Sequence, residues 1–150
     1  MIIRKADFTD IEVLLLFGKE LHFVEKKFEP DLKYSEEESR MRYLKQLNNP
    51  LALFLIVEDE TRNPLGYLYA HAEETNEQDQ LECNLEVIYL VPEFRGKGLS
   101  GQLIRSCIEW AKKNHITKIK TEIFAQNTAS RKAFEKIGFD PYLLIYSLEI

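Results

Sequence analysis

The spacing of apolar and polar residues divides the first half of the chain into a short strand, two helices and a run of strands. Apolar residues recur near a 3.6-residue period over 11–21 and over 41–47, which predicts two amphipathic helices. Each helix follows a capping-box pattern, Thr9-Asp10-Ile11-Glu12 and Ser35-Glu36-Glu37-Glu38. Short apolar or alternating runs predict strands at 1–4, 51–58, 65–73 and 81–91. Polar residues 74–80 predict a loop between the last two of these strands.

The second half of the chain alternates between helices and strands. An apolar stripe predicts a helix over 99–114, and alternation predicts a strand over 118–124. Asn127 is a suitable cap for a helix that runs to Ile137 and ends at Gly138, and a final strand follows at 139–148. Hairpin-linked strands followed by strand–helix alternation predict a mixed sheet with helices on both faces, in a single domain over 1–150.

Composition excludes several classes of protein. The longest unbroken apolar run, Leu51 to Val57, is far shorter than the ~20 residues of a membrane-spanning helix, and no leader is visible, so no membrane partner is expected. Cys83 and Cys107 have no metal-binding or redox spacing, which predicts reduced core thiols in a cytoplasmic protein and no metal site. The net charge of −5 argues against a nucleic-acid partner.

Charge is unevenly distributed along the chain. Residues 58–93 carry ten acidic side chains and one basic side chain, whereas residues 94–150 carry ten Lys or Arg against five Asp or Glu. Two interpretations stay open: these are solvated faces, or the basic third meets an anionic ligand while the acidic segment meets a cationic one.

A glycine-rich segment between a strand and a helix is the strongest chemical signal. Gly96, Gly98 and Gly101 are three of the six glycines in the chain. Such a loop before a helix N-terminus favours a pyrophosphate, with Arg95 and Lys97 adding positive charge.

The same segment is a literal G-x-G-x-x-G, which is a dinucleotide-binding pattern. About 95 residues precede it, whereas a dinucleotide-binding fold places the pattern after its first strand. Glu122, near the expected distance for a ribose-binding acid, falls within a predicted strand. A nicotinamide- or flavin-dinucleotide protein is therefore the weaker alternative.

Two motifs in this order resemble those of the GNAT N-acetyltransferases. Arg95, Gly96, Lys97 and Gly98 match the start of the family signature Q/R-x-x-G-x-G/A, from which Ser100 departs. Asn127, a helix and then Gly138-Phe139 match a second signature about 30 residues later. The resemblance implies an α/β fold of the α+β type, the GNAT acyl-CoA N-acyltransferase fold, with a mixed, mostly antiparallel central sheet.

The resemblance also implies acetyl-CoA as acetyl donor and a primary amine as acceptor. Main-chain atoms of the strand before the glycine loop would meet the pantetheine arm, and the loop amides would hold the pyrophosphate. The implied cofactor-binding residues are Ile88, Leu90, Arg95, Gly96, Lys97, Gly98, Ser100, Gly101, Asn127 and Arg131. For Arg131 a solvated helix face is an equal alternative.

Catalysis by such a family member needs a group that takes a proton from the amine. Glu86 is the first candidate for this base, with Glu82 and His71 behind it; Glu86 could also be an ion-pair or substrate-binding acid. Phe134 stands where the family usually has a Tyr that protonates the departing thiolate, and Tyr142 is the suggested substitute.

The acceptor and the assembly are less well defined by the sequence. Relatives build the acceptor pocket from the loop between the first two helices, where Glu25, Glu29 and Asp31 favour a cationic small molecule or peptide amine. Because Phe134 replaces the usual acid, an acyl-CoA-binding module with little or no catalysis is the alternative. A homodimer that pairs the C-terminal strands, with Tyr142, Leu144 and Tyr146, is a further expectation by analogy.

Overall fold

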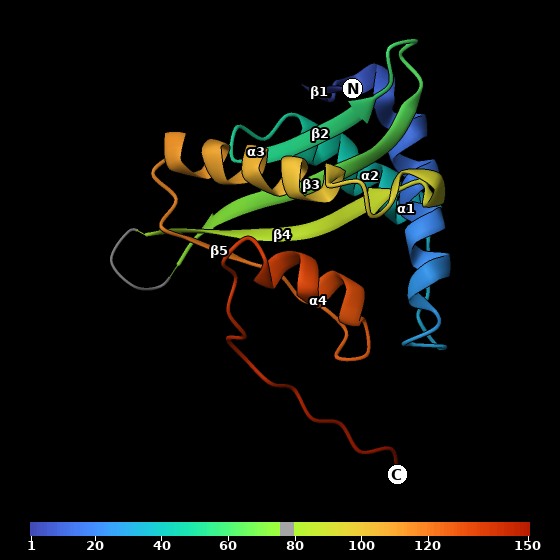
Figure 1. Cartoon of the computed structure of the whole chain (residues 1–150), viewed down its shortest axis with the longest axis vertical. Coiled ribbons are helices and arrows are strands. Elements are labelled where there is room, and N and C mark those ends of the chain that lie inside the picture. The colour runs from blue at the N-terminus through green and yellow to red at the C-terminus, as the bar shows by residue number, and fades with distance from the viewer. Residues whose placement is uncertain (76–79) are drawn as a thin grey trace.

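The computed structural model describes residues 1–75 and 80–150, and Figure 1 shows the whole chain. The middle of the predicted 74–80 loop, with Glu77 and Asp79 of the acidic segment, lies outside the described residues. Strands are β1 (Ile2–Lys5), β2 (Ala52–Glu58), β3 (Pro64–Glu74), β4 (Leu81–Leu90) and β5 (Lys118–Lys120). Helices are η1 (Phe8–Asp10), α1 (Ile11–Glu25), α2 (Glu36–Leu47), η2 (Pro92–Phe94), α3 (Leu99–Lys113) and α4 (Thr128–Glu135).

The strands of the described residues form one sheet in the order β1-β2-β3-β4-β5. The first four pair antiparallel with their sequence neighbours, and β5 pairs parallel with β4 after the crossover through α3. The sheet is therefore mixed and mostly antiparallel, as expected.

Helices cover both faces of this sheet, and the strand residues alternate between two cores. In β2, Leu53, Leu55 and Val57 face the core that contains α3 and Trp110, with Phe134 of α4 at its side. Phe54 and Ile56 face the opposite core, which contains α1 and α2. Figure 1 shows α3 crossing one face of the sheet while α1 and α2 lie on the other. Burial of both faces explains why β2 reads as a continuous apolar run.

The helix starts agree only in part with the capping boxes of the sequence. Ser35 caps α2, because its hydroxyl accepts a hydrogen bond from the Glu38 amide at 3.3 Å. The predicted cap at Thr9 is wrong: Asp7 accepts from the Thr9 amide, and Asp10 accepts from the Asp7 amide, both at 2.8 Å. Asp7 and Asp10 each accept one of these two amides, so Asp7 caps a short η1 that precedes α1.

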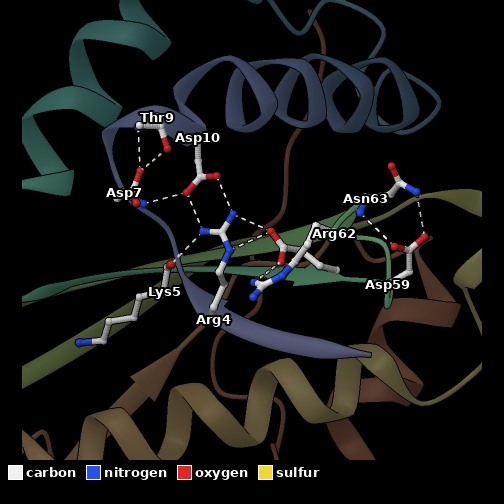
Figure 2. A network of polar contacts seen from close by, with 9 residues as sticks. Arg4, Lys5, Asp7, Thr9, Asp10, Asp59, Arg62 and Asn63 are labelled. Atoms are coloured by element: carbon white, nitrogen blue, oxygen red, sulfur yellow. Dashed lines mark hydrogen bonds and ion pairs between the residues drawn. The ribbon is translucent and has the colours of Figure 1, made fainter.

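An arginine network joins the N-terminal strand to the hairpin beside it (Figure 2). Arg4 donates two hydrogen bonds of 2.8 Å to the Asp10 carboxylate and one of 2.8 Å to Glu58. Asp10 and Glu58 are the buried charged residues among those described. The hydrogen bonds from Arg4 lower the pKa of both carboxyls, because they stabilise the charged form. The network holds the start of α1 against the sheet.

Two predicted strands differ from the structure near the C-terminus. Only 118–120 of the predicted 118–124 strand form a ladder, because β4 pairs with β5 no further than Asn84. The strand predicted over 139–148 is wrong for the isolated chain: these described residues have no ladder partner and form no strand. A strand exists only when another backbone accepts its hydrogen bonds, which the side-chain pattern does not supply.

No helix within residues 1–75 and 80–150 combines the length and apolar character needed to cross a membrane.

Candidate active site

A bulge in β4 places Glu86 at the centre of the site. Tyr69 of β3 pairs with Val87, and the next residue, Ala70, pairs with Leu85, so Glu86 has no partner of its own in the register. Before the bulge Cys83 and Leu85 face the core of α3, whereas after it Val87 faces the core of α1 and α2. A bulge bends a strand and redirects a side chain, and such features are frequent beside active sites.

Side-chain nitrogens of Arg42 and His71 both lie close to the Glu86 carboxylate. His71 Nδ1 of β3 lies 3.3 Å from Glu86 Oε1, and Arg42 Nη1 of α2 lies 3.4 Å from Oε2. The Tyr69 hydroxyl lies 3.4 Å from the same His71 nitrogen. The Glu86 side chain keeps 31% of its surface exposed. These contacts fix the carboxylate while one part of it stays accessible.

The accessible side of Glu86 opens into a cavity of about 470 Å³ between α1, α2 and the sheet. This volume is in the range of small-molecule sites. Charges of both signs line it, including Glu25, Glu38, Lys33 and Arg42. The α1–α2 loop contributes Leu32 to Ser35, so this region forms the wall that the sequence assigned to acceptor binding.

A second, narrower cavity of about 70 Å³ lies where β4 and β5 separate. Their pairing ends at Asn84 and Lys120, and beyond it the cavity is lined by residues of β4, by 121–124 and by the start of α4. On the side of β4 that faces β5, the edge from Leu85 to Ile88 therefore has no paired strand among the described residues. Such an edge can pair with an extended, amide-bearing ligand.

The two cavities share three lining residues, Leu21, Glu25 and Glu86. A group held in the narrow slot and a group held in the larger cavity would therefore meet beside two carboxylates. Glu25 has no hydrogen-bond or ion-pair partner for its side chain in the described part of the chain. Burial raises the pKa of its carboxyl. Sequence reasoning placed Glu25 in the acceptor pocket and missed its position at this junction.

The other two candidates for a base occupy different positions. Glu82 forms ion pairs with Lys118 at 3.9 Å and, more closely, with Lys120, and the hydrogen bond from Lys120 lowers the pKa of the Glu82 carboxyl. Glu82 therefore links β4 to β5. His71 contacts the carboxylate of Glu86, the first candidate, and therefore lies at the site beside it.

The glycine-rich loop forms an anion-binding arrangement on the surface. Gly96 and Gly98 have φ values of +72° and +81°, which favour glycine. A Cβ built at either position meets no described atom within 4 Å, so open space lies above the backbone. The amides of 96–101 donate to no backbone carbonyl among the described residues. Together with the N-terminus of α3 they can cradle a phosphate.

The remaining predicted cofactor-binding residues differ in what they can reach. Ile88 and Asn127 line the narrow cavity, although the side-chain Oδ1 of Asn127 already accepts from the Ser130 amide at 3.2 Å. Arg95 donates from Nε to the Leu90 carbonyl at 2.8 Å, so that carbonyl already accepts a hydrogen bond within the chain. Arg131 bonds the Ala125 carbonyl at 3.3 Å and lines neither of the two cavities described here.

The structure does not bring the suggested acid to the site. Phe134 is buried, lines the narrow cavity and packs edge-on against Phe139, at 5.1 Å between ring centroids. Tyr142 is 73% exposed and lines neither of the two cavities. Its ring lies under Lys118 Nζ, 3.7 Å from the centroid. Thr121 and Ser130 are hydroxyl residues that do line the narrow cavity.

The site combines three features: an unpaired β4 edge beside β5, a glycine-rich loop before α3, and a carboxylate shared by two cavities. Comparison with known proteins agrees with this arrangement. The model of the acetyltransferase (GNAT) family matches residues 21–139. The chain belongs to the GNAT acetyltransferase family. This GNAT chain is 28% identical over 134 residues to the N-acetyltransferase 9-like protein of Caenorhabditis briggsae, covering 87% of the chain and 64% of that protein. Across the curated relatives it matches, it spans between 23% and 64% of their length.

Solved structures confirm the GNAT fold. A mutant protein from Bacillus halodurans superposes with a TM-score of 0.89 at 18% identity, covering 100% of this chain and 99% of that one. A predicted acetyltransferase from Clostridium acetobutylicum, solved with acetyl-CoA, gives 0.83 at 20% identity, with 99% and 95% covered. At such identities the likeness concerns the fold alone.

Proposed function

We propose that this GNAT chain transfers an acetyl group from acetyl-CoA to a primary amine. The observation that carries the proposal is the junction of the two cavities beside the bulged Glu86. The structure solved with acetyl-CoA supports the choice of donor. The free β4 edge at 85–88 would bind the pantetheine arm, and the amides of 96–101 with Lys97 would bind the pyrophosphate.

The acetyl donor supplies an activated thioester carbonyl as substrate. The acceptor amine must lose a proton, and Glu86 takes that proton directly or through a water. The C–N bond forms as the C–S bond breaks, and the thiolate takes a proton from solvent. Because a thiol has a pKa near ~8.5, the thiolate leaves readily without a dedicated acid, which accommodates Phe134. Tyr142 does not enter this proposal, because it lies on an exposed segment outside both cavities.

The acceptor is proposed to be a cationic small molecule or a peptide amine. Glu25, Glu38 and Glu86 line the larger cavity, and Glu25 is free of any partner among the described residues. An ammonium group brought between Glu25 and Glu86 would gain charge-assisted hydrogen bonds in a partly buried site. Arg42 and Lys33 in the same cavity would bind a carboxylate or carbonyl elsewhere on the acceptor.

The first test measures ligand binding through thermal unfolding, with acetyl-CoA and NAD in parallel. A ligand at 100 times its Kd stabilises the folded state by about 2.7 kcal/mol. For a chain of this length that raises Tm by roughly 5–10 °C. A rise with acetyl-CoA alone supports the donor assignment, whereas a rise with NAD alone would overturn it.

The second test measures CoA thiol release with a panel of amines, including a polyamine, an aminoglycoside, a lysine peptide and glutamate. We expect release that depends on a cationic amine. Glu86→Gln should lower kcat by roughly 10²–10⁴ if the carboxylate is the base. Glu25→Gln should chiefly raise KM for the amine. Binding of acetyl-CoA without release for any amine would favour the binding module, and a preference for glutamate would refute the cationic acceptor.

A further inference from the structure

Arg42 of α2 lies in the larger cavity, against the carboxylate that the proposed reaction uses. Its Nη1 is 3.4 Å from Glu86 Oε2, and both side chains line this cavity. The Arg42 side chain is 50% exposed and that of Glu86 is 31% exposed. A cation that belongs to the protein is therefore already paired with Glu86, and an acceptor ammonium that arrives from the larger cavity has to compete with it.

The two oxygens of Glu86 are held by different parts of the molecule. Oε1 lies 3.3 Å from Nδ1 of His71, whose ring is 18% exposed and stacks on the Tyr69 ring at 5.8 Å between centroids. His71 belongs to β3 and lines neither of the two cavities. The contact with His71 is thus part of the sheet, whereas the contact with Arg42 is made by a cavity residue. The second contact is the one that a ligand can replace.

The pair of Arg42 and Glu86 has the features of an exchangeable ion pair. Its N···O distance of 3.4 Å is longer than the roughly 2.7–2.9 Å of a charge-assisted hydrogen bond. Arg4, by contrast, donates to its two carboxylate partners at 2.8 Å. An ion pair this exposed contributes little to stability, so opening it costs little. The guanidinium of Arg42 also lies over the Tyr43 ring, with Cζ 5.4 Å from the centroid, and this contact does not depend on Glu86.

Exchange of this pair is most favourable for a ligand that supplies both charges. Its ammonium pairs with Glu86 while its carboxylate pairs with Arg42, so that neither protein charge is left alone in the cavity. A guanidinium binds a carboxylate through two parallel hydrogen bonds, which favours a carboxylate over a neutral group. Because the two protein groups are 3.4 Å apart, the two ligand charges must also be close together. In an α-amino acid both are attached to the same carbon atom.

The remaining charges of the larger cavity favour a third, positive group on the ligand. Once Arg42 and Glu86 are matched, the charged Asp, Glu, Lys and Arg side chains left in the lining are Glu25 and Glu38 against Lys33. The excess is acidic, so a second ammonium is attracted and a second carboxylate is repelled. The volume of about 470 Å³ is in the range that accommodates a small molecule of this kind.

We propose that the acceptor is a free α-amino acid with a cationic side chain, whose ammonium and carboxylate take the place of the ion pair between Glu86 and Arg42. Arg42 is then a specificity-determining residue. It competes with an amine that brings no anion, and it binds the carboxylate of an amine that does, so that selection uses repulsion as well as attraction. The inference rests on the proposed function, because the ammonium that reaches Glu86 is the one to be acetylated.

The test is the affinity for lysine, lysinamide and cadaverine, measured by calorimetry without an acetyl donor so that no transfer occurs. These ligands share one carbon chain and differ beside the α-amine, where they carry a carboxylate, a neutral amide and a hydrogen. We expect lysine to bind more tightly than cadaverine by roughly 10- to 100-fold, as expected for hydrogen bonds between charged groups, with lysinamide between them.

Two variants on the same helix identify the residue responsible. Arg42→Met keeps an apolar stem and should bring the affinities for lysine and cadaverine close to each other. Cadaverine should bind more tightly to this variant than to the unaltered chain, because no guanidinium competes for Glu86. Arg40→Met is the matched control and should preserve the preference for lysine, because Arg40 pairs with Glu12 and Glu36 and lines neither cavity.

Several outcomes would overturn the inference. Loss of affinity for all three ligands in Arg42→Met would show a structural role only, and lysinamide binding as tightly as lysine would favour a peptide amine. No detectable binding of lysine would also refute it. Equal affinities for lysine and cadaverine in the unaltered chain would indicate that Glu38, one helical turn before Arg42 in the same cavity, accepts the released guanidinium.

CoA thiol release with the same amines separates this inference from the proposed function. Release from cadaverine as readily as from lysine would keep the transferase and overturn the amino-acid acceptor. Lysine binding that depends on Arg42, without release for any amine, would support the amino-acid site and refute the transfer reaction.

Discussion

Replacing Arg4 tests how far one guanidinium stabilises the fold. Arg4→Met keeps much of the apolar stem and removes three hydrogen bonds of 2.8 Å, two to Asp10 and one to Glu58. The side chains of these two acids are only 10% and 4% exposed. Breaking a buried ion pair by removing one partner costs roughly 3–5 kcal/mol.

The remaining contacts set the expected value within that range. Glu58 keeps Arg62 at 3.2 Å, and Asp10 keeps the Asp7 amide at 2.8 Å. We therefore expect the lower end, a loss of about 3 kcal/mol in the free energy of unfolding at pH 7. At roughly 2–4 °C per kcal/mol, Tm should fall by about 6–12 °C. Arg62→Met is the matched control: its side chain is 66% exposed, so a change within about 1 kcal/mol is expected.

The same variant predicts a pH dependence. Arg4 lowers the pKa of Asp10 and Glu58 from ordinary values of 3.8 and 4.5. A carboxyl whose pKa is lowered by folding stabilises the protein above its ordinary value, and this contribution is lost as pH falls through the folded-state value. The gap between the original protein and Arg4→Met should therefore narrow below about pH 4. Urea unfolding at pH 7 and at acid pH measures it; equal losses in Arg4→Met and Arg62→Met, or a gap that widens in acid, would refute the reasoning.

Three further predictions concern Gly98 in the glycine loop, Gly66 in β3 and Ser35 at the cap of α2. Gly98→Val, at φ +81°, should weaken acetyl-CoA binding at least tenfold in calorimetry, whereas Gly138→Val, at φ +105° and away from the loop, should alter stability and leave affinity unchanged. Gly66→Ala should lower the urea midpoint by the equivalent of roughly 1–3 kcal/mol, because its Cβ would lie 2.2 Å from the Tyr89 carbonyl oxygen; a neutral result would contradict this close approach. Ser35→Ala removes the cap of α2 and should cost about 1 kcal/mol in the same assay, with Ser35→Asp retaining most of the stability.

Much of the fold could be predicted from the sequence because its helices and central strands bury regular apolar patterns. The glycine loop was also predictable, because Gly96 and Gly98 adopt positive φ values that their sequence context suggested. The β2–β3 pair was predicted from the two short apolar runs at 51–58 and 65–73, and the two covered faces were predicted from the order of strands and helices.

The bulge at Glu86 could not be predicted in the same way. Cys83, Leu85, Val87 and Tyr89 form an unbroken alternation, which places all four on one face, yet the structure divides them between two cores. The available signal lay in the alternate, even-numbered positions of β4: Glu82 and Glu86 are acidic, whereas the next of these positions is the apolar Ile88. The cap at Asp7 is by contrast a local feature, made within residues 7–10, and the capping-box pattern at Thr9 was read in its place. The unpaired C-terminal segment depends on a backbone partner, which local patterns do not contain.

The sheet separates the two sides of the proposed transfer reaction. The larger cavity is formed from α1, α2 and one face of the sheet, whereas the glycine loop precedes α3, whose buried residues pack on the other face. Under the proposed function, substitutions in the α1–α2 loop would change which molecule is accepted without touching the core beneath α3. Glu86, outside the strand register, lies where the larger cavity meets the narrow one. If the proposed function holds, a protein built in this way can diversify in its choice of amine while its donor side stays the same.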